Sequence, residues 1–249
     1  MNRTVRMIFG HGNWWRFLPA YVKLAYYAAR TDAYPEQVKY DHASYMMQRA
    51  ILAGKVDLEV TGLENLPRQD GFLLYANHQG LFDVVAIVGT CPRAFGAVLK
   101  KELFKVPLVR ELALASHSLP LDRGSVRQSV RVMRTVGEEV KKGKNILIFP
   151  EGTRSRRENE MGPFHAGSFR CAQIAKCPIV PVTFFNSWKV LDRPGSAPVD
   201  AKIHYLKPIP YEEYAGLNTH AISDLTRSRL EAELSRLRAA EDSARPSLR

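Results

Sequence analysis

Cysteine is scarce in this chain of 249 residues, which has only Cys91, Cys171 and Cys177. Three thiols cannot all pair, and the spacing of the last two fits no common metal motif. A disulfide framework and a cysteine-based metal centre are therefore not expected. We interpret all three as small buried side chains of a protein in a reducing compartment.

Long apolar runs and one common hydrolase motif are also missing. The best candidate for a membrane-spanning helix, residues 17–29, is interrupted by Pro19 and Lys23, and it falls short of the ~18 apolar residues that a span needs. Residues 1–30 lack the apolar stretch and cleavage site of a secretory signal. No Gly-x-Ser-x-Gly elbow occurs, which disfavours a serine hydrolase of that type.

Acidic residues are outnumbered by basic ones, 25 against 36, so the net charge is +11. A basic surface favours an anionic partner. Three classes of partner fit this description: a nucleic acid, an anionic membrane and a phosphorylated ligand. No nucleic-acid-binding motif is present, so we expect no nucleic-acid partner. A non-catalytic basic protein that binds a membrane or a nucleic acid remains a distant alternative.

The first 30 residues hold five basic residues, no acidic residue and several aromatic ones. Apolar positions from 18 to 25 follow helical spacing. A basic, aromatic, amphipathic helix that is too short to span is typical of the membrane interface; the alternative is a helix packed on its own domain. With a second helix expected at 35–53, residues 1–54 are predicted to form an N-terminal amphipathic helical element that docks on an anionic membrane surface.

From Lys55 onward, strand-like and helix-like patterns alternate. Such alternation predicts an α/β fold with a central mixed, largely parallel β-sheet flanked by helices. We assign this domain to residues 55–240 and expect a disordered tail at 241–249. The expected strands are 56–60, 72–76, 95–99, 145–149, 179–184 and 202–206, and the expected helices are 82–89, 107–115, 126–140, 167–175 and 220–240.

The first candidate site follows the buried strand expected at 72–76. His78 lies in the turn that leaves this strand, where open α/β sheets usually bind ligands. Asp83 lies five residues further on, in the first turn of the next expected helix, and its carboxylate can reach one ring nitrogen of His78. That contact would fix the tautomer and leave the other nitrogen free as a general base. Alone, such a pair is more often a structural hydrogen bond.

The second candidate site follows the strand expected at 145–149 and reads Glu151-Gly152-Thr153-Arg154. Gly152 gives the turn backbone freedom, and a guanidinium at a strand end suits bidentate phosphate binding. The alternative for Arg154 is a surface ion pair with Glu151. Lys100 and Arg123 are further cationic candidates, because each also lies beside a short apolar run.

Five segments carry a family resemblance: Asn77-His78-x-x-x-x-Asp83, Lys100-Lys101-Glu102-Leu103, Leu121-Asp122-Arg123, Phe149-Pro150-Glu151-Gly152-Thr153-Arg154-Ser155 and Pro178-Ile179-Val180-Pro181-Val182. Together they resemble the ordered blocks of the glycerolipid acyltransferases, and most closely the bacterial 1-acyl-glycerol-3-phosphate acyltransferase (PlsC-like) type. Each block alone is weak, whereas the ordered set is highly specific. The blocks span Asn77 to Val182.

The resemblance implies transfer of a fatty acyl group from acyl-CoA or acyl carrier protein to the free hydroxyl of lysophosphatidate, giving phosphatidate in phospholipid biosynthesis. The alternative is the same chemistry on another lyso-lipid, such as a lysophospholipid or a lyso-ornithine lipid. No metal or resident cofactor is implied. The implied partners are the lyso-lipid, the acyl thioester, an anionic membrane surface and, where it carries the acyl group, acyl carrier protein. The implied location is peripheral or monotopic on the cytoplasmic face of the cell membrane.

The resemblance also implies roles for single residues. His78 is the general base and Asp83 orients it. The substrate-binding residues are Lys100, Arg123 and Arg154, which contact the acceptor's phosphate, and Glu151, Gly152 and Thr153 of the block that shapes the acceptor pocket.

Two positions depart from the family pattern. His165 stands where a lysine is common, and His117 lies in a region that usually holds a glycine. Both are secondary site candidates, and for both a structural role is the favoured interpretation.

Overall fold

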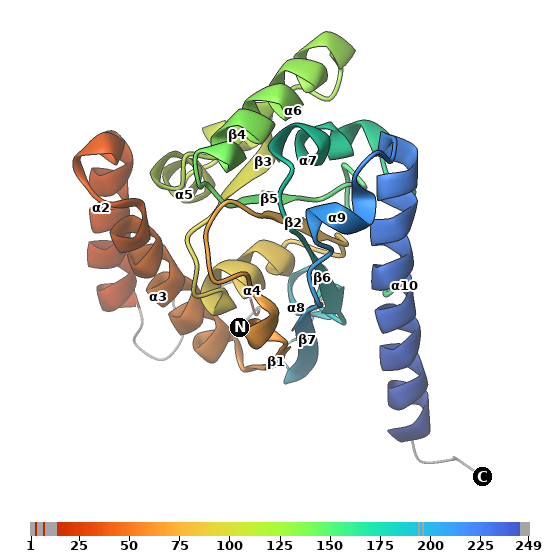
Figure 1. The fold of residues 1–249 in the computed structure, drawn as a ribbon. Helices are drawn as coiled ribbons and strands as arrows, with labels where there is room; N and C mark the ends of the chain where they lie inside the picture. Colours follow the sequence, from red (N-terminus) through yellow and green to blue (C-terminus); the bar gives the residue numbers. More distant parts are fainter. Residues whose placement is uncertain (1–2, 4–6, 8–13, 194, 196, 245–249) are drawn as a thin grey trace.

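A computed structural model describes residues 3, 7, 14–193, 195 and 197–244. Its strands are β1 (Val56–Thr61), β2 (Leu73–Ala76), β3 (Gly96–Lys100), β4 (Leu119–Leu121), β5 (Ile146–Ile148), β6 (Ile179–Phe185) and β7 (Val199–Tyr205). Its helices are α2 (Trp14–Ala29), α3 (Glu36–Gly54), α4 (Phe82–Thr90), α5 (Val109–Ala115), α6 (Val126–Lys141), α7 (Arg170–Ala175), α8 (Trp188–Leu191), α9 (Tyr211–Tyr214) and α10 (Thr219–Ala244). Figure 1 shows α2 and α3 on one flank and the long α10 on the opposite flank.

The strands of the described part form one sheet in the order β1-β7-β6-β2-β5-β3-β4. The five strands from β6 to β4 run parallel, whereas β7 pairs antiparallel with β6 and parallel with β1. The prediction of a mixed, largely parallel sheet is therefore confirmed. Because five strands point the same way, the loops that follow them meet at one edge of the sheet.

The side chains of β2 alternate between two apolar cores, because the side-chain period of a strand is two. Leu74 and Ala76 face the core that includes α3 and α4, whereas Leu73 and Tyr75 face the core that includes α6 and α7. All four are fully buried. Helices cover both faces, which is why this strand appears in the sequence as a continuous apolar run.

The N-terminal helices pack on the domain with one face only. Leu24 of α2 and Tyr40 and Met47 of α3 belong to the same core as β2. The outer face of α2 exposes four large apolar side chains, Trp15, Leu18, Val22 and Tyr26. Among the described helices, none is long and apolar enough to cross a membrane. Membrane docking by this element stays a prediction, and residues 1, 2, 4–6 and 8–13 lie outside the described residues.

Helix α10 continues to Ala244, so the prediction of a disordered tail is wrong for residues 241–244. The physical reason is Glu241, whose Oε1 accepts hydrogen bonds from Asn186 Nδ2 at 3.0 Å and from Lys189 Nζ at 3.4 Å. These contacts tie this turn of α10 to the domain. Residues 245–249 lie outside the described part of the chain.

Strand β4 was missing from the predicted elements because Leu119-Pro120-Leu121 contains a proline. Proline lacks the N–H that a central strand needs, but an edge strand tolerates it. β4 is the edge strand beside β3, with Pro120 opposite Leu99. The edge position therefore explains why a segment with a proline forms a strand, and why its sequence does not predict one.

All three cysteines are free and buried, as predicted. Burial raises the pKa of Cys91 to about 11 and the pKa of Cys171 and Cys177 to about 12. Thiolates are the reactive form of cysteine. These side chains therefore serve as apolar packing at neutral pH.

Candidate active site

The loops after β2, β5 and β6 meet at one edge of the sheet. β2 lies between β5 and β6, with Tyr75 opposite Ile148 on one side and Pro181 on the other. These loops carry His78, Glu151 and Ser187, respectively. Parallel register therefore brings together residues that lie more than 70 positions apart in the chain.

His78 and Asp83 form a hydrogen-bonded pair. The Nδ1 atom of His78 lies 2.8 Å from Oδ2 of Asp83, which is fully buried in the first turn of α4. The same Oδ2 accepts hydrogen bonds from the backbone N–H groups of Gln79 (2.7 Å) and Gly80 (3.0 Å), and Oδ1 accepts one from the Ser187 hydroxyl. Four donors thus hold the carboxylate in one orientation toward the imidazole.

This pairing leaves the Nε2 atom of His78 available for chemistry. A carboxylate is an acceptor, so Nδ1 carries the proton and Nε2 presents its lone pair. The ring of Phe149 stacks on the imidazole with centroids 4.1 Å apart. His78 keeps 17% of its side chain exposed. The imidazole is therefore fixed in orientation and still open to a ligand.

Glu151 contacts the loop that carries His78. Its side chain is buried, Oε1 accepts the backbone N–H of His78 at 2.7 Å, and Oε2 accepts that of Gly162 at 2.7 Å. Burial raises the pKa of Glu151 above its ordinary value, and these two N–H groups oppose the shift. Glu151 is absent from the lining of the described cavity and hydrogen-bonds the backbone of His78, and its role in shaping the acceptor pocket stays a prediction.

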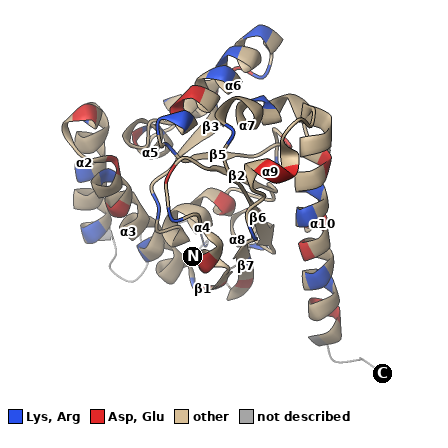
Figure 2. Ribbon diagram, viewed as in Figure 1, with Lys and Arg blue, Asp and Glu red and all other residues tan. Residues whose placement is uncertain are grey.

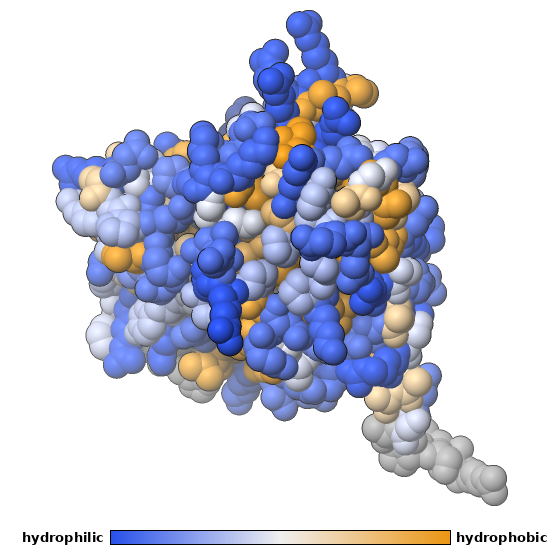
Figure 3. Space-filling model, viewed as in Figure 1, coloured by the Kyte–Doolittle hydropathy of each residue, from blue (hydrophilic) through white to orange (hydrophobic). Residues whose placement is uncertain are grey.

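A cavity of about 930 Å³ opens beside His78, and its lining is mostly apolar. Its walls include Tyr40 and Met47 of α3, so the N-terminal element contributes to the site. Hydrophilic side chains cover most of the face seen in Figure 3, and apolar ones show between them at its centre. The basic side chains in the lining of the cavity, besides His78, are Lys100, Arg123, His165 and Arg170.

Arg154 lies at the same strand end but does not belong to the cavity lining of the described residues. Its Nη1 pairs with Oδ1 of Asp192. The alternative of an ion pair with Glu151 is therefore wrong, because Glu151 is buried and already holds two backbone N–H groups. Gly152 lines the cavity with its φ at +66°, whereas Thr153 is exposed and is absent from the lining.

The two histidines that depart from the family pattern have different surroundings. His117 is absent from the cavity lining, and its Nε2 contacts Lys39 Nζ at 3.1 Å and Thr31 Oγ1 at 3.2 Å. That arrangement is structural. His165 lines the cavity beside Gly152, where a Cβ at position 152 would meet its ring at 3.0 Å.

Sequence reasoning missed Ser187 and Asp192, the two residues after β6 that contact the site. The Ser187 hydroxyl reaches Asp83, and the Asp192 carboxylate reaches Arg154 and the backbone N–H of Leu81. A signal was present, because Ser187 follows a buried strand just as His78 does. The carboxyl-end rule applied to that third strand would have indicated it.

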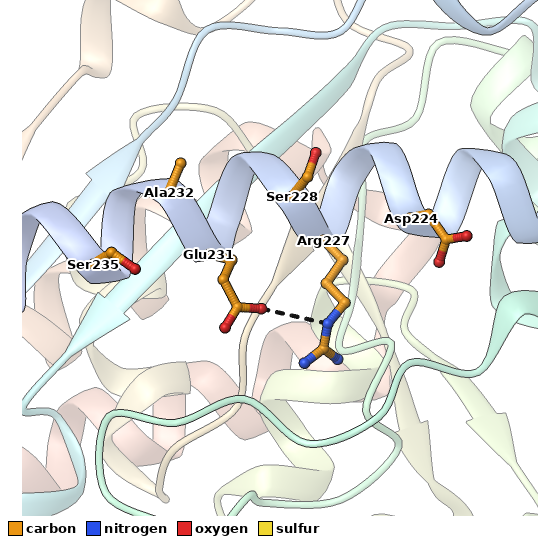
Figure 4. A pocket seen from close by; sticks show the side chains of 6 residues that line it. All are labelled: Asp224, Arg227, Ser228, Glu231, Ala232 and Ser235. Atoms are coloured by element: carbon orange, nitrogen blue, oxygen red, sulfur yellow. Dashed lines mark ion pairs between the residues drawn. The ribbon is translucent and has the colours of Figure 1, made fainter.

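A second hollow, of about 430 Å³, lies on α10 and has no feature of a catalytic site. Figure 4 shows its six side chains projecting from one helix, with the ion pair between Arg227 and Glu231, whose Nε and Oε2 atoms lie 3.5 Å apart. None of the predicted site residues lines it. The candidate site is therefore the cavity beside His78.

Comparisons with known proteins show what the chain is similar to. A family model described as Acyltransferase matches residues 57–185. A chloroplastic 1-acyl-sn-glycerol-3-phosphate acyltransferase of Brassica napus is 31% identical over 156 residues, covering 61% of this chain and 44% of the relative. The enzyme of that name from Saccharomyces cerevisiae is 37% identical over 134 residues (53% and 44%), and the one from Bacillus subtilis is 32% identical over 137 residues (55% and 66%).

The chain spans less than half the length of the first two of these relatives, 44% of each. Among solved structures, the 1-acyl-sn-glycerophosphate acyltransferase PlsC of Thermotoga maritima is similar, with a TM-score of 0.67 and 20% identity. The similarity covers 90% of this chain and 98% of that one. It shows that the two chains share a fold.

Proposed function

Because the chain belongs to the acyltransferase family, we propose that it transfers a fatty acyl group from an acyl thioester to the free hydroxyl of 1-acyl-glycerol-3-phosphate, giving phosphatidate. The observation that carries this proposal is the His78–Asp83 pair, oriented by four hydrogen bonds, at the wall of a large apolar cavity with cationic side chains. The names of the relatives support the choice of acceptor.

The proposed reaction begins with general-base catalysis by His78. Nε2 takes the proton of the acceptor hydroxyl while the hydroxyl oxygen attacks the thioester carbonyl carbon. The imidazolium that forms is stabilised by Asp83. The tetrahedral intermediate then expels the thiolate, the C–S bond breaks, and the proton on Nε2 passes to the sulfur. The ester product and a free thiol leave, and His78 returns to its starting form.

The apolar cavity supports binding of a fatty acyl chain. Side chains such as Val84, Leu99 and Leu112 line it, and burial of CH₂ groups against them is worth roughly 0.8 kcal/mol each. The thioester, carried by CoA or by acyl carrier protein, is a co-substrate. The proposed chemistry assigns no resident metal or cofactor, since a thioester carbonyl is already activated toward an alkoxide.

Cationic side chains support binding of the acceptor's phosphate. Lys100 and Arg123 lie in the cavity lining, and Arg154 lies at the adjoining strand end. Guanidinium and ammonium groups form charge-assisted hydrogen bonds with phosphate oxygens. We assign the phosphate to this group of three side chains.

The proposal includes peripheral or monotopic docking on the cytoplasmic face of the cell membrane through α2. The exposed side chains Trp15, Leu18, Val22 and Tyr26 recur at helical spacing and therefore share one face. Basic residues accompany them on α2, as they do along α6 (Figure 2). An apolar face with flanking cations is suited to an anionic membrane surface. Docking there would deliver the lyso-lipid to the cavity.

Product identification tests the proposed reaction. The intact chain is incubated with acyl-CoA and a mixed pool of lyso-lipids, and the products are identified by mass spectrometry, with His78→Ala as the inactive reference. We expect phosphatidate as the main product. Equal or faster acylation of a phosphate-free acceptor, such as a lyso-ornithine lipid, would contradict the choice of lysophosphatidate.

A further inference from the structure

The carboxylate of Asp192 occupies a position between two hydrogen-bond donors at the rim of the cavity. Its Oδ1 pairs with the guanidinium of Arg154, and its Oδ2 accepts the backbone N–H of Leu81 at 2.9 Å. Leu81 is the N-cap residue of α4, and it lines the cavity together with Gly80 and His78. A Cβ at Gly80 would overlap Oδ2. An anionic group of the protein itself therefore contacts Leu81, which lies three residues along the chain from the candidate base His78.

These two donors match a phosphate monoester. Backbone N–H groups at a helix N-terminus and a guanidinium are both groups that bind phosphate oxygens. In 1-acyl-glycerol-3-phosphate, the carbon that bears the phosphate is bonded to the carbon that bears the reacting hydroxyl. A hydroxyl placed at His78 therefore brings the phosphate close to the residues that follow His78, which are the residues that Asp192 contacts.

We propose that Asp192 occupies the phosphate position of the acceptor in the free protein, and that a phosphate monoester binds by displacing it from Arg154 and Leu81. This inference rests on the proposed function. The Asp192 carboxylate then competes with every anion at this position. A lyso-lipid overcomes the competition because its acyl chain adds apolar binding energy in the cavity, whereas a small soluble phosphate lacks that contribution.

The ion pair between Arg154 and Asp192 has the properties of an ion pair that exchanges partners. The side chains of Arg154 and Asp192 are 30% and 27% exposed, and ion pairs in contact with solvent contribute little to stability. A phosphate monoester carries a charge of about −1.5 to −2 at neutral pH, against −1 for a carboxylate. The incoming group is therefore the stronger partner for the guanidinium.

The test replaces Asp192 by Asn, which keeps the size of the side chain and an oxygen acceptor for the Leu81 N–H. We expect Asp192→Asn to lower the KM for lysophosphatidate and the inhibition constant of glycerol 3-phosphate by about fivefold each, since removal of a weak competitor raises the fraction of open sites. The KM for the thioester should stay within about twofold. The control is Asp200→Asn, which removes the same charge from an exposed position on β7 and should change neither constant.

A double-mutant cycle separates local competition from long-range charge effects. In an Arg154→Ala background, Asp192→Asn should change the KM for lysophosphatidate by less than about twofold, because the two residues no longer interact. If Asp192→Asn lowers the KM for lysophosphatidate equally in both backgrounds, the proposal is overturned. A KM that is unchanged or raised in the single variant also overturns it, because Asp192 would then position Arg154 for the substrate.

Calorimetry distinguishes failure of this inference from failure of the proposed function. Glycerol 3-phosphate is titrated into the intact chain and into Asp192→Asn, without any thioester. Tighter binding by the variant supports the exchange even where no acyl transfer is found, in which case only the proposed function fails. Normal acyl transfer with unchanged binding by the variant overturns the exchange and leaves the proposed function in place.

Discussion

The backbone N–H of His78 donates a hydrogen bond to Oε1 of Glu151, and the two atoms lie 2.7 Å apart. The residues follow β2 and β5, which are neighbours in the sheet. A second backbone contact, from the Ser155 N–H to the carbonyl of His78 at 2.8 Å, joins the same two loops. The position of the candidate base therefore depends on the loop after β5 as much as on its own loop.

Replacing Glu151 by Gln should lower both stability and turnover. The amide has a single acceptor oxygen, so its NH₂ group would face the N–H of either His78 or Gly162. A buried donor without an acceptor costs about 1–3 kcal/mol, and a small displacement of the base costs on the order of 10² in kcat. Urea unfolding and kcat measure the two effects. Glu64→Gln, at an exposed position, is the control, and equal behaviour of the two variants would remove the assigned role.

Replacing His78 by Ala should lower kcat by about 10² or more, the usual contribution of a positioned general base. Co-sedimentation with anionic vesicles should be unchanged, because His78 lies at the cavity and not on α2. His220→Ala, an exposed histidine at the start of α10, is the control. Full activity of His78→Ala would show that the imidazole is not the base.

Replacing Arg154 by Ala should raise the KM for the phosphorylated acceptor by about tenfold, since a charge-assisted hydrogen bond contributes about 1.5–3 kcal/mol. The KM for the thioester should stay within about twofold. Steady-state kinetics with each substrate varied separately measures both. Arg134→Ala removes an exposed cation of α6 as the control. A larger rise in the KM for the thioester than in the KM for the acceptor would place the phosphate elsewhere.

The contact between His117 and Lys39 predicts a loss of stability in acid. Burial, together with Lys144 and Lys39, lowers the pKa of His117, against the opposing effects of Glu36 and Asp32. A lowered pKa means that the stabilising contribution is complete above the unfolded value of about 6.5 and is lost as the pH falls through the folded value.

Denaturant unfolding at about pH 7.5 and about pH 5 measures this effect. The decline in free energy of unfolding should be smaller in His117→Gln than in the original chain. His220→Gln, which changes an exposed histidine, should keep the full decline. Identical declines in all three proteins would refute the assignment to His117.

The exposed face of α2 should carry the membrane affinity. A double variant, Leu18→Ser with Val22→Ser, removes two side chains that are 58% and 59% exposed. Each apolar side chain that is fully buried contributes roughly 1.5–3 kcal/mol, so partitioning into anionic vesicles should fall at least about tenfold. Vesicle co-sedimentation measures it. Leu217→Ser, before α10, is the control, and unchanged partitioning of the double variant would contradict docking through α2.

Local patterns predicted the buried strands and the turn that carries His78. The apolar run at 72–76 forms β2 between two covered faces, and Asp83 lies in the first turn of α4, as predicted from the sequence. The edge strand β4 and the helical turn at 241–244 escaped prediction. Strand β4 contains a proline that only an edge position tolerates, and the helical turn at 241–244 is held by side chains from distant segments.

The sequence by itself determined that an imidazole and a carboxylate lie together after a buried strand, because the contact spans only five residues of the chain. Only the tertiary structure decided which groups surround that pair. Ser187 reaches Asp83 across 104 positions, and Asp192 reaches Leu81 across 111. Such contacts depend on the order of strands in the sheet, and the periodicity of a single segment carries no information about its neighbours in space.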